Sequence, residues 1–227
     1  MISDLDLIAS YEDMLMNATS TFKQDFCATQ KDHESRGLTV LCCYLLEDVL
    51  DLNPIEAKTS LTKKTLKEFK LWNYIEKFID FEPGMNEQEQ IIYLLHLCYP
   101  KIIPFDKKRY VISIYEKVIN RQMAAFPKKF FSEKKGATRA CICLQYMVDK
   151  LYSFHTVNEL YELFNNEAEM AKILKENKMH KACYLQYDTP LDFLHYSLSP
   201  AKRNTFLYNY FKFNSILEQT EKKESKN

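Results

Sequence analysis

The sequence predicts an all-α protein made of two related multi-helix units joined by a basic helical connector. Apolar residues recur at spacings of three and four over most of the chain, the period of amphipathic helices. The 227 residues include only three glycines and seven prolines, fewer than the tight turns of a strand-rich fold require. Apolar residues make up 46% of the chain, enough to form a hydrophobic core.

Charge and composition divide the chain into five predicted segments. We expect N-terminal acidic helices over residues 1–36, a first helical repeat unit over 37–105 and a basic connector helix over 106–135. A second repeat unit that ends in an aromatic helix follows over 136–217, and 218–227 form a polar tail expected to be disordered.

In the first half, apolar positions within residues 2–16 predict an amphipathic helix. A buried helix is expected over 37–52, ended by Pro54, whose ring cannot occupy a helix interior. The apolar pattern of residues 61–81 predicts one long helix. The next helix begins at Asn86, where Glu89 can complete a capping box.

In the second half, the connector is expected to hold one helix of about three turns. A buried helix follows over 132–152, with the Ser132 hydroxyl as its cap, and the pair Thr156 and Glu159 predicts another helix start. Residues 167–187 are expected to continue helically. Thr189 with Pro190 and Asp192 has the residue types that begin a helix.

Two stretches of the chain resemble each other. Gly37-Leu38-Thr39 and Gly136-Ala137-Thr138 each precede a pair of cysteines, and Leu66–Leu71 resembles Leu174–Met179. Ile91, Tyr93, Leu94 and Pro100 match Leu191, Phe193, Leu194 and Pro200 at a constant offset. The conserved order favours an internal duplication over roughly sixty residues, with chance similarity between two helical segments as the alternative.

Several short segments carry a family resemblance. They are Leu97-Cys98-Tyr99-Pro100, Ile103-Pro104-Phe105, Phe126-Pro127 with Phe130-Phe131, and Leu174–Lys178. With them the chain resembles an uncharacterised helical-repeat domain family of spore-forming Gram-positive bacteria, over about residues 40–205. Lys101 stands where that family has glycine, and Phe105 and Phe131 stand where it has tryptophan. The resemblance implies a helical repeat fold and a bacterial or mobile-element origin, and it implies no activity.

The residue patterns argue against catalysis, a cofactor or a metal site. The seven cysteines lie mostly in apolar periodic runs, and none has the two-residue gap typical of zinc ligands. No glycine-rich phosphate loop or nucleophile elbow is present. We expect reduced thiols in a cytoplasmic, non-enzymatic protein, without a membrane span because no apolar run approaches the ~20 residues needed.

Basic residues concentrate in the middle of a chain whose net charge is zero. Residues 101–139 hold eleven positive and three negative side chains, a net charge of +8, while 1–60 carry −7 and 140–200 carry −3. The candidate nucleic-acid-binding residues are Lys107, Lys108, Arg109, Lys117, Arg121, Lys128, Lys129, Lys134 and Lys135. Such clusters are typical of phosphate-binding surfaces.

The charge pattern leaves several functions open. The first hypothesis is a regulatory or nucleic-acid-associated binding protein that contacts phosphates through the connector. The second is a protein–protein interaction adaptor without nucleic-acid contact, in which the acidic first helices or the aromatic last helix engage a partner. The basic residues could also neutralise acidic segments of the same protein, or contact a membrane surface. The sequence makes no prediction of oligomeric state.

Overall fold

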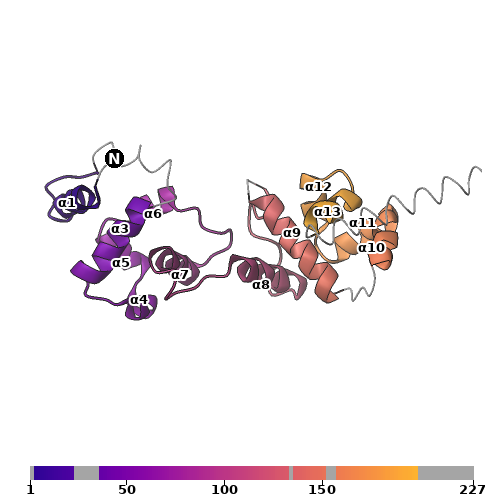
Figure 1. Ribbon diagram of the computed structural model, residues 1–227, viewed down its shortest axis with the longest axis horizontal. Helices are drawn as coiled ribbons and strands as arrows, with labels where there is room; N and C mark the ends of the chain where they lie inside the picture. The colour runs from indigo at the N-terminus through magenta and orange to yellow at the C-terminus, as the bar shows by residue number, and fades with distance from the viewer. Residues whose placement is uncertain (1–2, 23–35, 133–134, 152–156, 199–227) are drawn as a thin grey trace, which may run out of the picture. The chain divides into compact units, whose positions relative to one another are not determined.

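The computed structural model describes residues 3–22, 36–132, 135–151 and 157–198, and every regular element among them is a helix (Figure 1). The all-α prediction is therefore confirmed. The chain forms two compact units, Met1–Asp106 (unit 1) and Lys107–Asn227 (unit 2). The segment predicted as a connector thus lies almost entirely in unit 2. The expected aromatic helix and polar tail lie outside the described residues.

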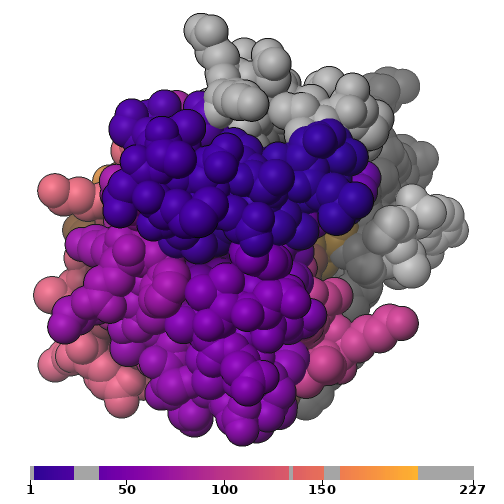
Figure 2. Space-filling view, turned by 90° about the vertical axis from the view of Figure 1, so that its left-hand side faces the viewer, coloured from indigo at the N-terminus to yellow at the C-terminus, as the bar shows by residue number. Residues whose placement is uncertain are grey.

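Unit 1 is built around a central helix that contacts both its first and its last helix. Its helices are α1 (Asp4–Leu15), α3 (Arg36–Tyr44), α4 (Pro54–Ser60), α5 (Lys63–Glu68), α6 (Trp72–Phe78) and α7 (Glu87–Cys98), with a wider π-helical turn, η1 (Leu45–Val49), directly after α3. Helix α3 packs against α1 and α7, and Leu41, Leu45 and Trp72 are buried between the helices. In Figure 2, α1 covers one side of the helices that follow it.

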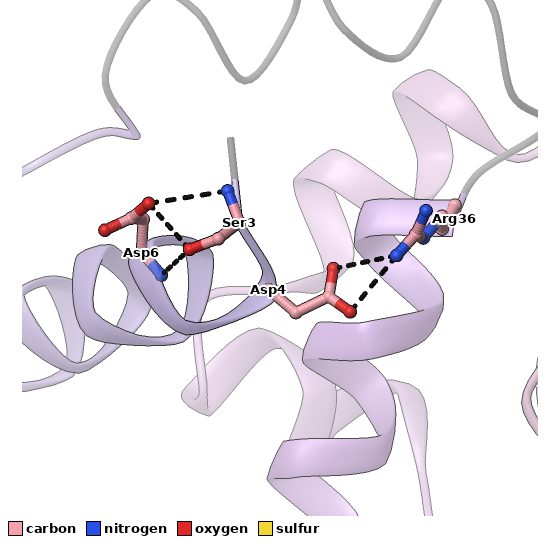
Figure 3. Close-up of polar contacts among 4 residues, drawn as sticks. All are labelled: Ser3, Asp4, Asp6 and Arg36. Carbon is pink, nitrogen blue, oxygen red and sulfur yellow. Dashed lines mark hydrogen bonds and ion pairs between the residues drawn. The ribbon is translucent and has the colours of Figure 1, made fainter. Parts of the chain in front are cut away.

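Side-chain caps begin several helices of unit 1. At α1 the Ser3 hydroxyl accepts a hydrogen bond from the Asp6 backbone N–H (3.1 Å), and the Asp6 carboxylate accepts one from the Ser3 N–H (3.4 Å) (Figure 3). Asp4 forms an ion pair of 3.2 Å with Arg36, which joins α1 to α3. At α7 the Asn86 N–H donates to the Glu89 carboxylate (2.8 Å) and the Glu89 N–H donates to the Asn86 side-chain oxygen (2.9 Å), so the predicted capping box is confirmed.

Unit 2 has the same order of elements as unit 1. It contains α8 (Lys107–Ile119), α9 (Gly136–Tyr146), the π-helical turn η2 (Met147–Leu151), α10 (Val157–Asn165), α11 (Glu167–Glu176), α12 (His180–Gln186) and α13 (Pro190–Ser197). Helix α9 contacts α8 and α13, as α3 contacts α1 and α7. Thr189 accepts a hydrogen bond from the Asp192 N–H (3.1 Å), so the predicted start of α13 is confirmed.

Matched tyrosine contacts show that the two units are structural repeats. The Tyr11 hydroxyl of α1 donates to the Phe69 carbonyl (2.7 Å), and the Tyr115 hydroxyl of α8 donates to the Asn177 carbonyl (3.1 Å). A second tyrosine matches as well. Tyr44 donates to Glu12 and packs edge-on against Tyr11, as Tyr146 donates to Glu116 and packs edge-on against Tyr115. A phenylalanine also stacks on the first tyrosine of each unit, Phe22 on Tyr11 and Phe126 on Tyr115. The duplication therefore includes α1 and α8, beyond the sixty residues that the sequence suggested.

Two helices that the sequence predicts as continuous are broken at equivalent lysines. Lys70 and Lys178 both have φ of 61°, and both turns close with a hydrogen bond from the following residue, Leu71 N–H to Leu66 O (2.9 Å) or Met179 N–H to Leu174 O (2.7 Å). These left-handed turns divide 61–81 into α5 and α6, and 167–187 into α11 and α12. The prediction of long helices was wrong because lysine carries none of the turn signal of glycine or asparagine.

The structure also corrects the alignment of the two buried helices. The tyrosines Tyr44 and Tyr146 and the π-helical turns after them match at an offset of 102 residues, which pairs Gly37 with Arg139 instead of Gly136. A shift of three residues is almost one helical turn, so it preserves the apolar pattern on which the sequence alignment depends. Ser132 does not cap α9, which begins at Gly136 without a side-chain cap.

Candidate nucleic-acid interface

Helix α8 carries four of the predicted basic residues around its surface. Its buried side is formed by Tyr110, Val111, Ile114, Tyr115 and Val118. Lys108 and Lys117 are nine residues apart, so at about 100° per residue their side chains leave opposite sides of the helix. Lys107 and Arg109 lie with Lys108 in the first turn. The basic residues therefore form two groups, one near each end of a helix about 20 Å long, and not one continuous stripe.

The loop between α8 and α9 adds exposed positive charges. Arg121, two residues after the end of α8, has a left-handed conformation (φ 61°), and Lys128 and Lys129 are exposed further along the loop. Phe126 stacks on Tyr115 of α8 with ring centroids 6.1 Å apart, and it also packs against Phe130 at 5.2 Å. These ring contacts hold the loop against α8 and leave its lysines at the surface.

The remaining basic residues of the segment differ in their environments. Lys135 is half-buried beside the start of α9, and Lys134 lies outside the described residues. Arg139 is buried: its Nε donates to the Phe130 carbonyl (2.5 Å), and its guanidinium lies over the Phe130 ring at 5.5 Å. One of the eleven positive charges counted in the sequence is therefore part of the core.

Intramolecular pairing separates the surface residues into two classes. Within the described residues, the side chains of Lys108, Lys117, Arg121 and Lys128 form no hydrogen bond or ion pair, whereas Lys107, Arg109, Lys129 and Lys135 each take part in an interaction within the chain. Glu116 is the acidic residue of α8, and its carboxylate accepts a hydrogen bond from Tyr146. We call Lys108, Lys117, Arg121 and Lys128 the open basic set.

The duplication shows which residues the same fold accepts in place of the open basic set. The match between Tyr11 and Tyr115 places Asp4 at the position of Lys108, Asp13 at that of Lys117 and Asn17 at that of Arg121. Asn17 has φ of 59°, close to the 61° of Arg121. The packing of this helix therefore does not require positive charge at these positions.

The two matching helices α1 and α8 also differ in the charges of their first turns. The first turn of α8 has Lys107, Lys108 and Arg109 and no acidic residue, whereas the first turn of α1 has Asp4 and Asp6. The N-terminus of a helix carries partial positive charge, so cations there are unfavourable and anions are favourable. Asp106 places one carboxylate directly before α8, and the three basic residues that follow it are unfavourable for the helix.

No catalytic or metal-binding group emerges from the described residues. They contain no cluster of three or more histidine, cysteine or acidic side chains placed to hold a metal ion. Six cysteines in them are free thiols. Burial raises the pKa of Cys183 to about 12 and also raises that of Cys143, so both thiols stay protonated at neutral pH.

Sequence reasoning missed a cavity of about 100 Å³ in unit 2. It lies between the C-terminal part of α9, η2 and α13, and its walls include Val148, Asp149 and Leu198. None of these residues has a type or spacing that suggests a site.

Comparisons with known proteins match unit 2 alone. Residues 111–197, from α8 to the end of α13, match the model of a family described as "Protein of unknown function (DUF4046)". Neither the curated proteins nor the solved structures contain a significant match to the chain. In the part of the chain that the structure describes, no helix has the length and apolar composition needed to cross a membrane.

Proposed function

We propose that this protein binds nucleic acid through phosphate contacts made by the open basic set, and that it acts as a regulatory or nucleic-acid-associated binding protein rather than an enzyme. The observation that carries the proposal is the contrast between two equivalent helices. The same packing positions hold Asp4, Asp13 and Asn17 in unit 1 and Lys108, Lys117 and Arg121 in unit 2.

The arrangement of the open basic set fits a polyanion better than one small anion. Lys108 lies near the start of α8, and Lys117 and Arg121 lie near its end, so the two groups are separated by roughly 13 Å along the helix, with Lys108 and Lys117 on opposite sides of it. A phosphodiester backbone presents charges over such distances, whereas a single phosphate contacts one group only. Lys128 extends the second group from the loop.

Salt dependence gives the proposal a quantitative form. If the four open side chains each contact one phosphate of a duplex, the logarithm of the binding constant falls with the logarithm of salt concentration with a slope of about −3.6. Raising salt from roughly 50 to 200 mM then weakens binding about 150-fold. Protein contacts that do not displace counterions show a much smaller dependence.

The test is a titration of the full chain against labelled duplexes of about 20 base pairs, in DNA and RNA form, followed by fluorescence anisotropy. The variant Lys108→Asp, Lys117→Asp, Arg121→Asn introduces the residues of unit 1, so the fold accepts them. It should reduce the salt slope by about 3. Binding to vesicles that contain anionic lipid distinguishes specific binding of nucleic acid from a general affinity for anionic surfaces.

A matched control keeps the change in net charge equal. Lys172→Glu, Lys175→Glu and Lys181→Gln replace exposed lysines of α11 and α12 in the same unit, and the net charge falls by five in both variants. The control should bind like the unmodified chain. Equal losses in the two variants, or no binding by the unmodified chain at low salt, would contradict the proposal.

A second candidate function, a protein–protein adaptor, is favoured by α1. Leu5, between Asp4 and Asp6 in the first turn, is 79% exposed, and Met16, directly after the last turn of the helix, is 70% exposed. Exposed apolar side chains among carboxylates suit a basic, amphipathic partner. Leu5→Glu with Met16→Glu should abolish copurification of such a partner, whereas Ile55→Glu on α4 is the control. Unchanged copurification would exclude this role for α1.

A further inference from the structure

A lysine of unit 1 connects two segments that are distant in the sequence. The Nζ atom of Lys70 donates hydrogen bonds to the Met14 carbonyl, in the last turn of α1, and to the side-chain oxygen of Asn17 (2.7 Å). Asn17 lies two residues after the end of α1, and Lys70 lies between α5 and α6. Both residues have left-handed backbones, with φ of 59° and 61°. The lysine thus joins the end of α1 to the turn after α5.

Unit 2 has two cations at the same two positions. The matching tyrosine contacts place Arg121 at the position of Asn17, two residues after the end of α8. They also place Lys178, between α11 and α12, at the position of Lys70. Arg121 and Lys178 both have φ of 61°. The left-handed backbone is therefore repeated at both positions, and arginine replaces asparagine at one of them.

This replacement removes the acceptor for the lysine. An arginine side chain has donors and no acceptor, so Arg121 cannot take the hydrogen bond that Asn17 takes from Lys70. Within the described residues, the side chains of Arg121 and Lys178 are exposed and form no hydrogen bond or ion pair. Two neighbouring like charges repel each other. An anion between them would remove the repulsion and accept hydrogen bonds from both.

The chemistry of the two side chains fits a phosphate group. The guanidinium of Arg121 is a planar fork that pairs with two phosphate oxygens, and the ammonium of Lys178 adds a compact point charge. Lys117, in the last turn of α8, belongs to the same end of the helix. A phosphodiester backbone, with one negative charge per nucleotide, can contact all three cations.

We propose that Arg121 and Lys178 together bind one phosphate group, and that this group is a phosphodiester of the nucleic acid contacted by the open basic set. The location of the site rests on the repeat, whereas the source of the phosphate rests on the proposed function. Charge counting along the sequence missed Lys178, because it belongs to residues 140–200, whose net charge is −3.

The first experiment titrates the full, isotope-labelled chain with inorganic phosphate, against sodium chloride of equal ionic strength. Chemical-shift changes should saturate with a dissociation constant in the millimolar range, as expected for two charge-assisted contacts. Lys178→Gln should weaken phosphate binding about tenfold. The matched control is Lys175→Gln, at an exposed lysine in the last turn of α11, and it should bind like the unmodified chain. Equal weakening by both variants, or no saturation in the unmodified chain, would overturn the site.

The second experiment introduces the residue of unit 1. Arg121→Asn gives Lys178 the acceptor that Lys70 has, so it should abolish saturable binding of phosphate. In chloride it should also raise the thermal midpoint of unit 2 by roughly 4 °C, a gain that is lost when Lys178→Gln is added. A folded Arg121→Asn variant that binds phosphate like the unmodified chain would overturn the pairing of the two cations.

The third experiment separates this site from the proposed function. In duplex titrations, Arg121→Asn and Lys178→Gln should each weaken binding, and together they should weaken it by less than the product of the two factors, because both contact one phosphate. Factors that multiply would overturn the shared contact. If duplexes bind and Lys178→Gln has no more effect than Lys175→Gln, this inference fails and the proposed function stands. If inorganic phosphate binds at the site and no duplex binds, the proposed function fails, and with it the phosphodiester as the source.

Discussion

Replacing Lys108 by aspartate should stabilise unit 2, because it gives α8 the residue that α1 has at Asp4. A charge in the first turn of a helix contributes about 0.3–1 kcal/mol, unfavourable for a cation and favourable for an anion. The substitution removes an unfavourable cation and adds a favourable anion. Because Lys108 is exposed, we expect the free energy of unfolding to rise by about 1 kcal/mol. For a unit of this size, that corresponds to roughly 4 °C in the thermal midpoint.

The single tryptophan of the chain makes the assay specific to each unit. Trp72 is buried in unit 1, so its fluorescence reports unfolding of unit 1, whereas far-UV circular dichroism reports both units. Lys108→Asp should raise the dichroism transition of unit 2 and leave the fluorescence midpoint unchanged. The reciprocal Asp4→Lys should lower the fluorescence midpoint, because it also removes the ion pair with Arg36.

Salt supplies the decisive comparison for this prediction. At about 1 M salt the Debye length is near 3 Å, so most of the gain from Lys108→Asp should disappear. A gain that persists at high salt would refute the electrostatic reasoning, as would a loss of stability at low salt. A shift of the Trp72 fluorescence midpoint by Lys108→Asp would show that the effect is not local to unit 2.

Three further substitutions test the repeat through urea unfolding. Tyr115→Phe removes the hydrogen bond to Asn177 and should cost about 1–2 kcal/mol in unit 2; an unchanged midpoint would contradict that contact. Gly136→Ala should cost more than about 2 kcal/mol, because its Cβ would lie 2.2 Å from the Phe131 carbonyl oxygen, and a neutral result would exclude this approach. Lys178→Asn should raise the free energy of unfolding of unit 2 by about 0.5 kcal/mol, because asparagine tolerates the left-handed φ of 61° better than lysine. Lys178→Ala should give no gain, and equal effects of the two substitutions would argue against backbone strain at this residue.

Local signals in the sequence were enough to predict two of the helix starts. The capping box of Asn86 and Glu89 and the start at Thr189 appear in the structure as expected, because each depends on contacts within three residues. The left-handed lysines Lys70 and Lys178 were missed for the opposite reason. Their conformation is stabilised by the packing of α5 on α6 and of α11 on α12, and no local residue type indicates it.

The candidate site was also predicted only in part. Charge counting located the basic segment, but it included the buried Arg139 and suggested one strip where α8 has two separated groups. The helical period of α8 was sufficient to place Lys108 and Lys117 on opposite sides. The cavity could not be derived from any single residue, because its walls come from α9, η2 and α13, which are distant in the sequence.

Arg139 holds the loop between α8 and α9 in place from the core of unit 2. Its guanidinium holds the Phe130 carbonyl from inside unit 2, at a helix position where unit 1 has Gly37. A loop that is already held by a buried hydrogen bond loses little conformational entropy when its surface residues bind a partner. The backbone near Lys128 is therefore held in place when unit 2 folds, and under the proposed function a polyanion binds without reordering it.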